Sequence, residues 1–126
     1  MWYNLTSMAL THLRVTVSNP SDPKNKERVG FLVDSGAVYS VVPRKTLMRL
    51  GIGPEEEREF TLANGQVVKR FLGIARFEYD KHRGGAPVIF GEKNDSALLG
   101  ATTLEAMGMA LNPLKRELMP LPMVLG

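Results

Sequence analysis

The chain has 126 residues, of which 44% are hydrophobic and 23% are charged, and its formal net charge is +3. This length fits one domain, so we expect residues 1–126 to fold as a single unit around a real hydrophobic core. The absence of cysteine excludes disulfides, thiolate nucleophiles and thiolate metal sites.

The distribution of charged and apolar residues argues against two classes of partner. The basic residues are scattered along the chain, so the positive charge indicates a solvated surface rather than a nucleic-acid interface. No apolar run approaches the length that crosses a bilayer, and the first residues lack the plan of a signal peptide. We therefore predict a cytoplasmic protein without a membrane partner, in which residues 1–7 form an extension.

The first predicted unit is a hairpin. Apolar and polar residues alternate over residues 11–18, which is typical of a half-buried strand. A proline-containing segment ends this strand, and a polar turn over residues 24–27 leads into a second strand, residues 29–33. The second arm of the hairpin therefore delivers Asp34 at its end.

A short strand and a short helix are predicted next. The strand covers residues 39–42, and the helix opens at Pro43, carries Leu47, Met48 and Leu50 as its apolar stripe, and stops at Gly51. The acidic run that follows, residues 55–57, lacks the spaced oxygen ligands and the loop glycine of a hard-cation site. We expect it to be a solvated connection.

The clearest hairpin of the chain covers residues 59–71, where apolar and polar residues alternate around an Asn-Gly pair that suits a type I′ turn. Beyond Gly73, a new strand is predicted over residues 75–79, followed by a polar turn over residues 80–85. Another strand is predicted over residues 87–90.

A segment in the last third of the chain has a pattern similar to one in the first third. Apolar residues run into Gly100, and a helical pattern follows that ends at Gly108, before one or two short terminal strands. Glycines with apolar neighbours close both helices, at residues 49–52 and 106–109. The similarity between these two segments is weak and involves only two short stretches.

Two motifs in this order carry a resemblance to a known family. An apolar strand end runs into residues 34–37, which read Asp-Ser-Gly-Ala, and alone this pattern is typical of an ordinary turn. About sixty residues later, residues 97–101 carry a Leu-Leu pair into a glycine and a helix. From Leu13 to Leu121 the chain resembles the retropepsin-like aspartic proteases. The resemblance implies a mainly β, closed-barrel acid-protease fold with two short helices.

The resemblance also implies roles for the residues of the first motif. Asp34 is the expected catalytic carboxylate. Ser35, Gly36 and Ala37 are expected to support the active loop. The hydroxyl of Ser35 would brace two such loops, Gly36 would allow a close approach, and Ala37 would keep the neighbouring space small.

Two further groups of residues receive roles from the same resemblance. Leu98, Leu99 and Gly100 are expected to pack behind the active loop without a direct chemical part. Asn64 and Gly65 are the candidate tip of a flap that folds over the substrate. The alternative for these two residues is a plain surface hairpin.

Hydrolysis of a peptide bond by carboxylates needs one ionised carboxylate as base and one protonated carboxyl as acid. Two carboxyls about 3 Å apart cannot both ionise cheaply, so they share a proton. The chain has one Asp-Ser-Gly triplet, and its other aspartates, at positions 22, 80 and 95, lie in predicted polar turns. The second carboxyl is therefore expected from Asp34 of another copy, at the two-fold axis of a homodimer. The expected substrate is a polypeptide.

One alternative from another class stays open: a catalytically inactive peptide-binding or dimerisation module with the same fold. Against it, an unpaired carboxylate at a buried axis would cost stability without a chemical role. A serine nucleophile at Ser35 or Ser40 would need a histidine base, and His12 and His82 are predicted at a strand end and in a turn. No phosphate loop or ligand-spaced His cluster is present in the sequence, so no cofactor or metal is expected.

Overall fold

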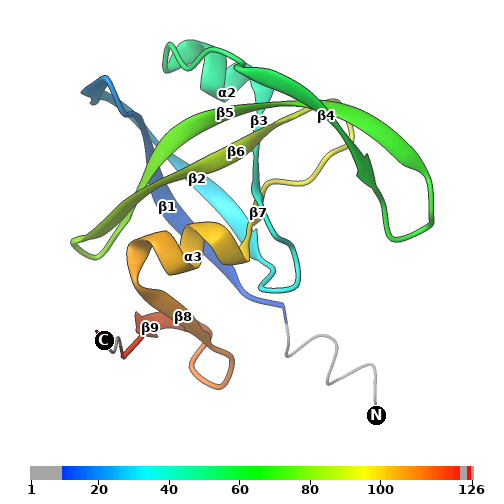
Figure 1. Ribbon diagram of the computed structural model, residues 1–126. Helices are drawn as coiled ribbons and strands as arrows, with labels where there is room; N and C mark the ends of the chain where they lie inside the picture. The colour runs from blue at the N-terminus through cyan, green and yellow to red at the C-terminus, as the bar shows by residue number, and fades with distance from the viewer. Residues whose placement is uncertain (1–9, 123–124, 126) are drawn as a thin grey trace.

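The structure of the chain is a computed structural model that describes residues 10–122 and residue 125 (Figure 1). The extension predicted over residues 1–7 lies outside the described residues. The strands are β1 (His12–Asn19), β2 (Asp22–Val33), β3 (Ser40–Pro43), β4 (Glu56–Thr61), β5 (Val67–Tyr79), β6 (His82–Gly91), β7 (Leu98–Leu99), β8 (Met109–Asn112) and β9 (Glu117–Pro120). The helices are α2 (Arg44–Arg49) and α3 (Ala101–Met107). The prediction of a mainly β fold with two short helices is confirmed.

Seven strands form one sheet in the order β1-β2-β7-β3-β6-β5-β4, and β8 pairs with β9 in a separate two-stranded sheet. β1 also pairs with β5, through residues 16–18 and 76–78. The strands β1, β2, β7, β3, β6 and β5 are therefore paired in a ring. β4 lies outside this ring, and the β4–β5 hairpin projects from the body of the molecule (Figure 1). The fold therefore combines a curled sheet with one overhanging hairpin.

The core is built from alternate residues of the strands. Val15 and Val17 of β1 are fully buried while Arg14 is exposed, as the two-residue period of a strand requires. Phe31 of β2 and Phe77 of β5 are also buried, and their ring centroids lie 6.3 Å apart. This separation is within the range of favourable aromatic pairs.

The first hairpin has a shorter turn than the sequence predicts. β2 begins at Asp22, so residues 24–27 lie in the strand, and two of them, Lys26 and Glu27, pair with β1 instead of forming a turn. Most side chains at this end of the hairpin are exposed. The apolar alternation that identifies a half-buried strand is therefore missing there.

The turn between β5 and β6 is also shorter than the predicted turn over residues 80–85. β6 begins at His82, and the reversal consists of Asp80 and Lys81, whose φ values are 47° and 71°. Positive φ at both central residues defines a type I′ turn, which matches the twist of the flanking strands.

β5 runs unbroken through Gly73, where the sequence predicts a boundary between two strands. A Cβ atom at Gly73 would lie 2.9 Å from the backbone oxygen of Gly53, so this glycine allows two segments to approach closely. Its neighbour Leu72 pairs with both Glu56 of β4 and Ile89 of β6. β5 changes partner at this point, and its first half belongs to the projecting hairpin.

The tip of the β4–β5 hairpin is a three-residue loop rather than the predicted type I′ turn. Of the Asn-Gly pair, Gly65 alone has a positive φ, 86°. The N–H of Gly65 donates to the carbonyl of Leu62 at 2.9 Å, and the N–H of Leu62 donates to the carbonyl of Gln66 at 2.8 Å. These bonds fit a type I turn closed by a left-handed glycine.

At the base of the hairpin, β4 includes part of the acidic run over residues 55–57, which is therefore not a simple connection.

Helix α2 differs from its prediction in two details. Pro43 immediately precedes the helix instead of lying in its first turn, and Gly51, with a φ of 75°, follows it. Leu47 and Leu50 are buried, but Met48 is 56% exposed and does not belong to the apolar stripe.

Each short strand pairs in parallel with a long strand from the other part of the chain. β2 runs parallel to β7, and β3 runs parallel to β6. The short strands β3 and β7 lead into α2 and α3, so each helix follows a strand that pairs with the other half. The two segments with a similar sequence pattern thus occupy matching places, each a short strand followed by a helix. Within the described residues, no helix has both the length and the apolar character needed to cross a bilayer.

Candidate active site

Asp34 follows the last residue of β2 and is held by hydrogen bonds on both sides. Its N–H donates to the carbonyl of Leu99 at 2.9 Å, and its carbonyl accepts the N–H of Ala37 at 3.1 Å. Its carboxylate Oδ1 accepts the N–H of Gly36 at 3.0 Å, and the residue is exposed. The loop therefore presents a carboxylate in a fixed position at the surface of a single chain.

The residues after Asp34 complete the loop, and Gly36 lies against the carboxylate. Ser35 and Gly36 are exposed, and Ala37 is half-buried. A Cβ atom on Gly36 would lie 3.2 Å from Oδ1 of Asp34, so a larger residue would crowd the carboxylate. The carbonyl of Ala37 accepts the N–H of Ala101 at 2.7 Å, which ties the loop to the start of α3.

Leu98, Leu99 and Gly100 lie directly behind this loop. Both leucines form β7, which pairs in parallel with the end of β2, and Leu99 is fully buried. Gly100 is the last residue before α3 and is also buried. The two motifs singled out in the sequence are thus in direct contact, although the sequence separates them by about sixty residues.

A buried hydroxyl pair that the sequence reasoning missed fixes the position of Gly100. Oγ of Ser40 accepts the N–H of Gly100 at 2.9 Å and is hydrogen-bonded to Oγ1 of Thr103 at 2.5 Å. Both hydroxyl residues are fully buried, so Ser40 is inaccessible as a nucleophile. A signal for this role was present, because Ser40 shares its strand face with the apolar Val42, and a buried hydroxyl needs a partner.

Replacing Ser40 with alanine is expected to lower the free energy of unfolding by about 2 kcal/mol, because it leaves the buried N–H of Gly100 and the hydroxyl of Thr103 without this partner. Urea unfolding followed by circular dichroism measures the loss. Ser21→Ala, at an exposed turn, is the matched control and should change stability by less than about 0.5 kcal/mol. Equal stability of the two variants would contradict the structural role of Ser40.

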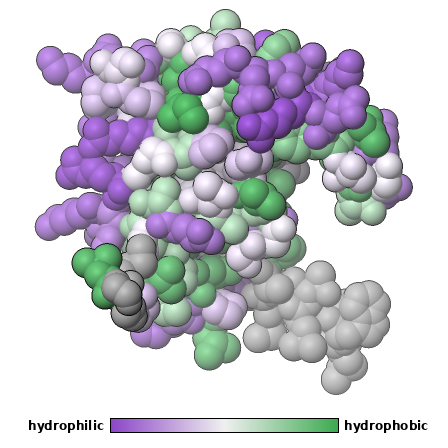
Figure 2. Space-filling view, viewed as in Figure 1, coloured by the Kyte–Doolittle hydropathy of each residue, from purple (hydrophilic) through white to green (hydrophobic). Residues whose placement is uncertain are grey.

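A groove of about 380 Å³ lies between the β4–β5 hairpin and the strands beside the Asp34 loop. Its apolar lining includes Leu32, Val41, Phe60, Val68, Ile89 and Leu98. Figure 2 shows the surface hollowed beside the projecting hairpin. Asn64 and Gly65 are exposed at the tip of this hairpin. An apolar groove roofed by a hairpin suits an apolar side chain of an extended peptide.

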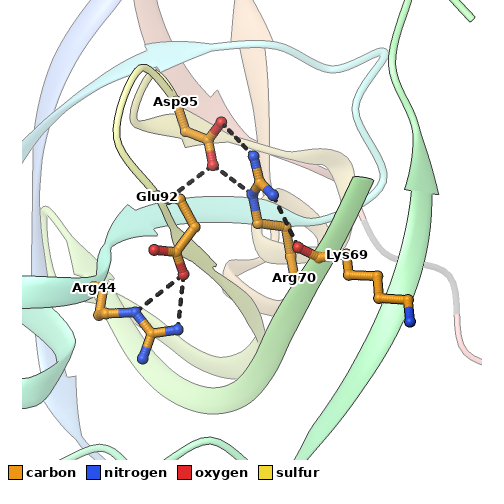
Figure 3. Close-up of polar contacts among 5 residues, drawn as sticks. All are labelled: Arg44, Lys69, Arg70, Glu92 and Asp95. Carbon is orange, nitrogen blue, oxygen red and sulfur yellow. Dashed lines mark hydrogen bonds and ion pairs between the residues drawn. The ribbon is translucent and has the colours of Figure 1, made fainter. Parts of the chain in front are cut away.

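Two ion pairs hold the loop between β6 and β7 beside this groove (Figure 3). Arg70 of β5 donates from Nε and Nη2 to the two carboxylate oxygens of Asp95, at 2.7 and 3.1 Å. Arg44 of α2 donates from Nε and Nη2 to Oε2 of Glu92, at 3.0 and 2.7 Å. The hydrogen bonds from Arg70 lower the pKa of Asp95; partial burial opposes this effect, and the N–H of Glu92 reinforces it.

The β4 strand of the hairpin contacts the segment that follows the Asp34 loop. Nη1 of Arg58 donates to the hydroxyl of Tyr39 at 3.1 Å, and the rings of Tyr39 and Phe60 meet edge-on with centroids 6.4 Å apart. Hydrogen bonds to Glu56 and Tyr39 raise the pKa of Arg58, so its guanidinium stays charged. Both strands of the hairpin are thus attached to the body of the protein.

Asp34 and Ser35 also line an open hollow of about 690 Å³. The other walls are mostly apolar and include Leu104, Met109, Leu111, Pro113 and Leu121. Apolar side chains therefore flank the Asp34 carboxylate on this face of the chain.

The two histidines and the acidic residues lie as follows. His12 begins β1 and His82 begins β6, so neither histidine lies in the loop over residues 34–37. Among residues 10–122 and 125, no group of three or more histidine, aspartate or glutamate residues could hold a metal ion.

The family model for aspartyl proteases matches residues 14–103, and the chain therefore belongs to the aspartyl protease family. Among solved structures, the fold is similar to that of EIAV protease complexed with the inhibitor HBY-793. That similarity has a TM-score of 0.61 and 17% identity, and it covers 82% of this chain and 92% of the other. The solution structure of simian foamy virus (mac) protease matches with a TM-score of 0.49 and 16% identity over 74% of this chain and 92% of the other. No curated protein sequence matches the chain. The retropepsin-like fold predicted from the sequence is thereby confirmed.

Proposed function

We propose that this chain is an aspartic endopeptidase that acts as a homodimer, with Asp34 of each subunit in one active site. The observation that carries the proposal is the exposed Asp34 carboxylate, fixed by the N–H of Gly36 beside an apolar hollow. One carboxylate cannot serve as base and acid in the same step, so a second must be supplied. A symmetric contact brings identical groups together at its axis. Membership of the aspartyl protease family supports this reading.

In the proposed mechanism the two Asp34 carboxyls share one proton, because two like charges so close cannot both ionise cheaply. The ionised carboxylate takes a proton from a water molecule, whose oxygen attacks the carbonyl carbon of the peptide. The protonated carboxyl gives its proton to the carbonyl oxygen. When the tetrahedral intermediate collapses, the C–N bond breaks and the carboxyl that took the water proton gives it to the leaving nitrogen. The other carboxylate takes a proton from a hydroxyl of the intermediate, so the dyad again holds one proton.

The remaining motif residues would position this dyad and the substrate. The Ser35 hydroxyl would brace the two active loops across the axis, and Gly36 and Ala37 would keep the approach open. The peptide would lie extended in the apolar groove, with the β4–β5 hairpin as a flap and Asn64 and Gly65 at its tip. The apolar hollow beside Asp34 would be covered by the second subunit.

A subunit-mixing experiment tests the homodimer. Wild-type protein is equilibrated with a threefold excess of Asp34→Asn subunits, and hydrolysis of a peptide with apolar residues is followed. Random pairing leaves about a quarter of the wild-type subunits with a wild-type partner, so activity should fall to about a quarter. An equal mass of an unrelated protein is the control and should leave activity unchanged.

Two results would contradict the proposal. Unchanged activity in the mixture, after subunit exchange has been verified by sedimentation of labelled protein, would show that one chain is sufficient. Wild-type protein that dimerises and binds peptide but cleaves none would favour the alternative, a catalytically inactive peptide-binding or dimerisation module.

We also propose, from the sequence, that residues 1–126 form one retropepsin-like domain and that it acts in the cytoplasm. Proteolysis of the intact chain into a stable smaller core would contradict the first statement. Fractionation of the producing cells tests the second.

A further inference from the structure

On the basis of the proposed function, we propose that the Arg70–Asp95 ion pair latches the β4–β5 hairpin to the loop between β6 and β7, and so positions the hairpin over the peptide groove (Figure 3). Both residues line the groove. Arg70 is a positioning residue, because it shapes the groove without contacting the reacting groups.

The geometry of the pair resists rotation on both sides. Arg70 makes two parallel bonds to the two oxygens of Asp95, and its Nη1 also donates to the carbonyl of Lys69 at 2.8 Å. Oδ2 of Asp95 accepts the backbone N–H of Glu92 at 2.8 Å as well. Each partner is therefore fixed to its own segment, and bidentate contacts of this kind are geometrically specific. The hairpin and the loop are joined as two rigid pieces.

The positions of Arg70 and Asp95 allow the ion pair to connect the hairpin to the segment behind the Asp34 loop. Arg70 stands in the projecting half of β5, before the strand changes partner at Leu72. Asp95 stands in the loop that leads into β7, which supports the Asp34 loop. The pair thus connects the overhanging hairpin to the segment that backs the catalytic carboxylate.

The pair is more sheltered than the other ion pairs among the described residues. Its side chains are 18% and 24% exposed, whereas those of the other pairs are between 35% and 59% exposed. Shelter reduces screening by salt and water. Glu92 is the other acid facing Arg70, and Arg44 neutralises it.

The latch should persist in mild acid. The bonds from Arg70 lower the pKa of Asp95, so the contribution of the pair to stability is present above the ordinary aspartate pKa. It is lost only as the pH falls through the lowered pKa of the folded state. The hairpin is therefore held throughout the range from mildly acid to neutral pH.

Arg70→Met tests the latch in two independent ways. In the active protein, KM should rise about tenfold while kcat changes less than about twofold, because the groove is loosened and the dyad is not. In the inactive Asp34→Asn background, hydrogen exchange of the amides in the β4–β5 ladder should become about tenfold faster. Arg76→Met, on the same strand but outside the groove, is the matched control and should change neither quantity.

Exchanging the charges of residues 70 and 95 should restore the ion pair and with it a low KM. Arg70→Asp and Asp95→Arg should each raise KM about tenfold, and the double variant should return KM to within about threefold of wild type. Asp95→Asn keeps an acceptor for the Glu92 amide, so it removes the charge while leaving the turn of the loop in place.

The latch is overturned if Arg70→Met matches Arg76→Met in both KM and hydrogen exchange, or if Asp95→Asn leaves KM at the wild-type value. Failure of the proposed function looks different. In that case the wild-type protein cleaves no peptide, while the exchange rates in the Asp34→Asn background still decide whether the hairpin is latched.

Discussion

Asp34→Asn is expected to reduce peptide hydrolysis by at least about 100-fold between mildly acid and neutral pH, because the amide can neither take nor share the catalytic proton. The substitution is nearly isosteric, and the asparagine oxygen can still accept the N–H of Gly36. We therefore expect the thermal midpoint and the dimer to be preserved. Initial rates with apolar peptides, circular dichroism and sedimentation measure the three quantities.

Asp80→Asn is the matched control for this experiment, because it makes the same chemical change at an exposed turn with positive φ, which asparagine tolerates well. Its activity should equal that of the wild type. The wild-type rate should also show a bell-shaped pH profile, since the proposed dyad works with one shared proton and fails with two or none. Full activity in Asp34→Asn would remove the dyad from the mechanism.

The sequence predicts those parts of the structure that depend on local patterns. Alternation identifies the buried faces of β1 and β2, and the end of β2 predicts where Asp34 lies. The predictions fail where a strand leaves the core, as over residues 24–27, because exposed strand residues need not alternate. They also fail at Gly73, where a close approach between segments has the same sequence pattern as a turn.

The surroundings of the site depend on contacts between distant segments, and these the sequence does not reveal. Asp95 reads as part of a polar turn, and its partner Arg70 is one of several arginines in the chain. Ser40 reads as one polar residue at the start of an apolar strand, yet it becomes the buried acceptor for Gly100. In each case the partner is chosen by how the strands are ordered in the sheet, which local periodicity does not determine.

Gly100→Ala is expected to lower the free energy of unfolding by about 3 kcal/mol, since it overpacks a backbone crossing that cannot yield easily. A Cβ atom at Gly100 would lie 2.6 Å from the carbonyl oxygen of Tyr39 and 2.9 Å from that of Ala37. The backbone of Gly100 itself is extended, with φ of −97°, so the cost is steric and not conformational. The thermal midpoint, measured at one fixed protein concentration, should fall by about 10 °C.

Gly30→Ala is the matched control for this second substitution. A Cβ atom at Gly30 would meet no atom within 4 Å, and the residue is exposed on β2, so the thermal midpoint should stay unchanged or rise slightly. Because the carbonyl of Ala37 also anchors α3, displacing it in Gly100→Ala should move the Asp34 loop and reduce peptide hydrolysis. Equal midpoints for the two alanine variants would mean that the two motifs do not touch as closely as the structure has them, and that the Asp34 loop is supported from elsewhere.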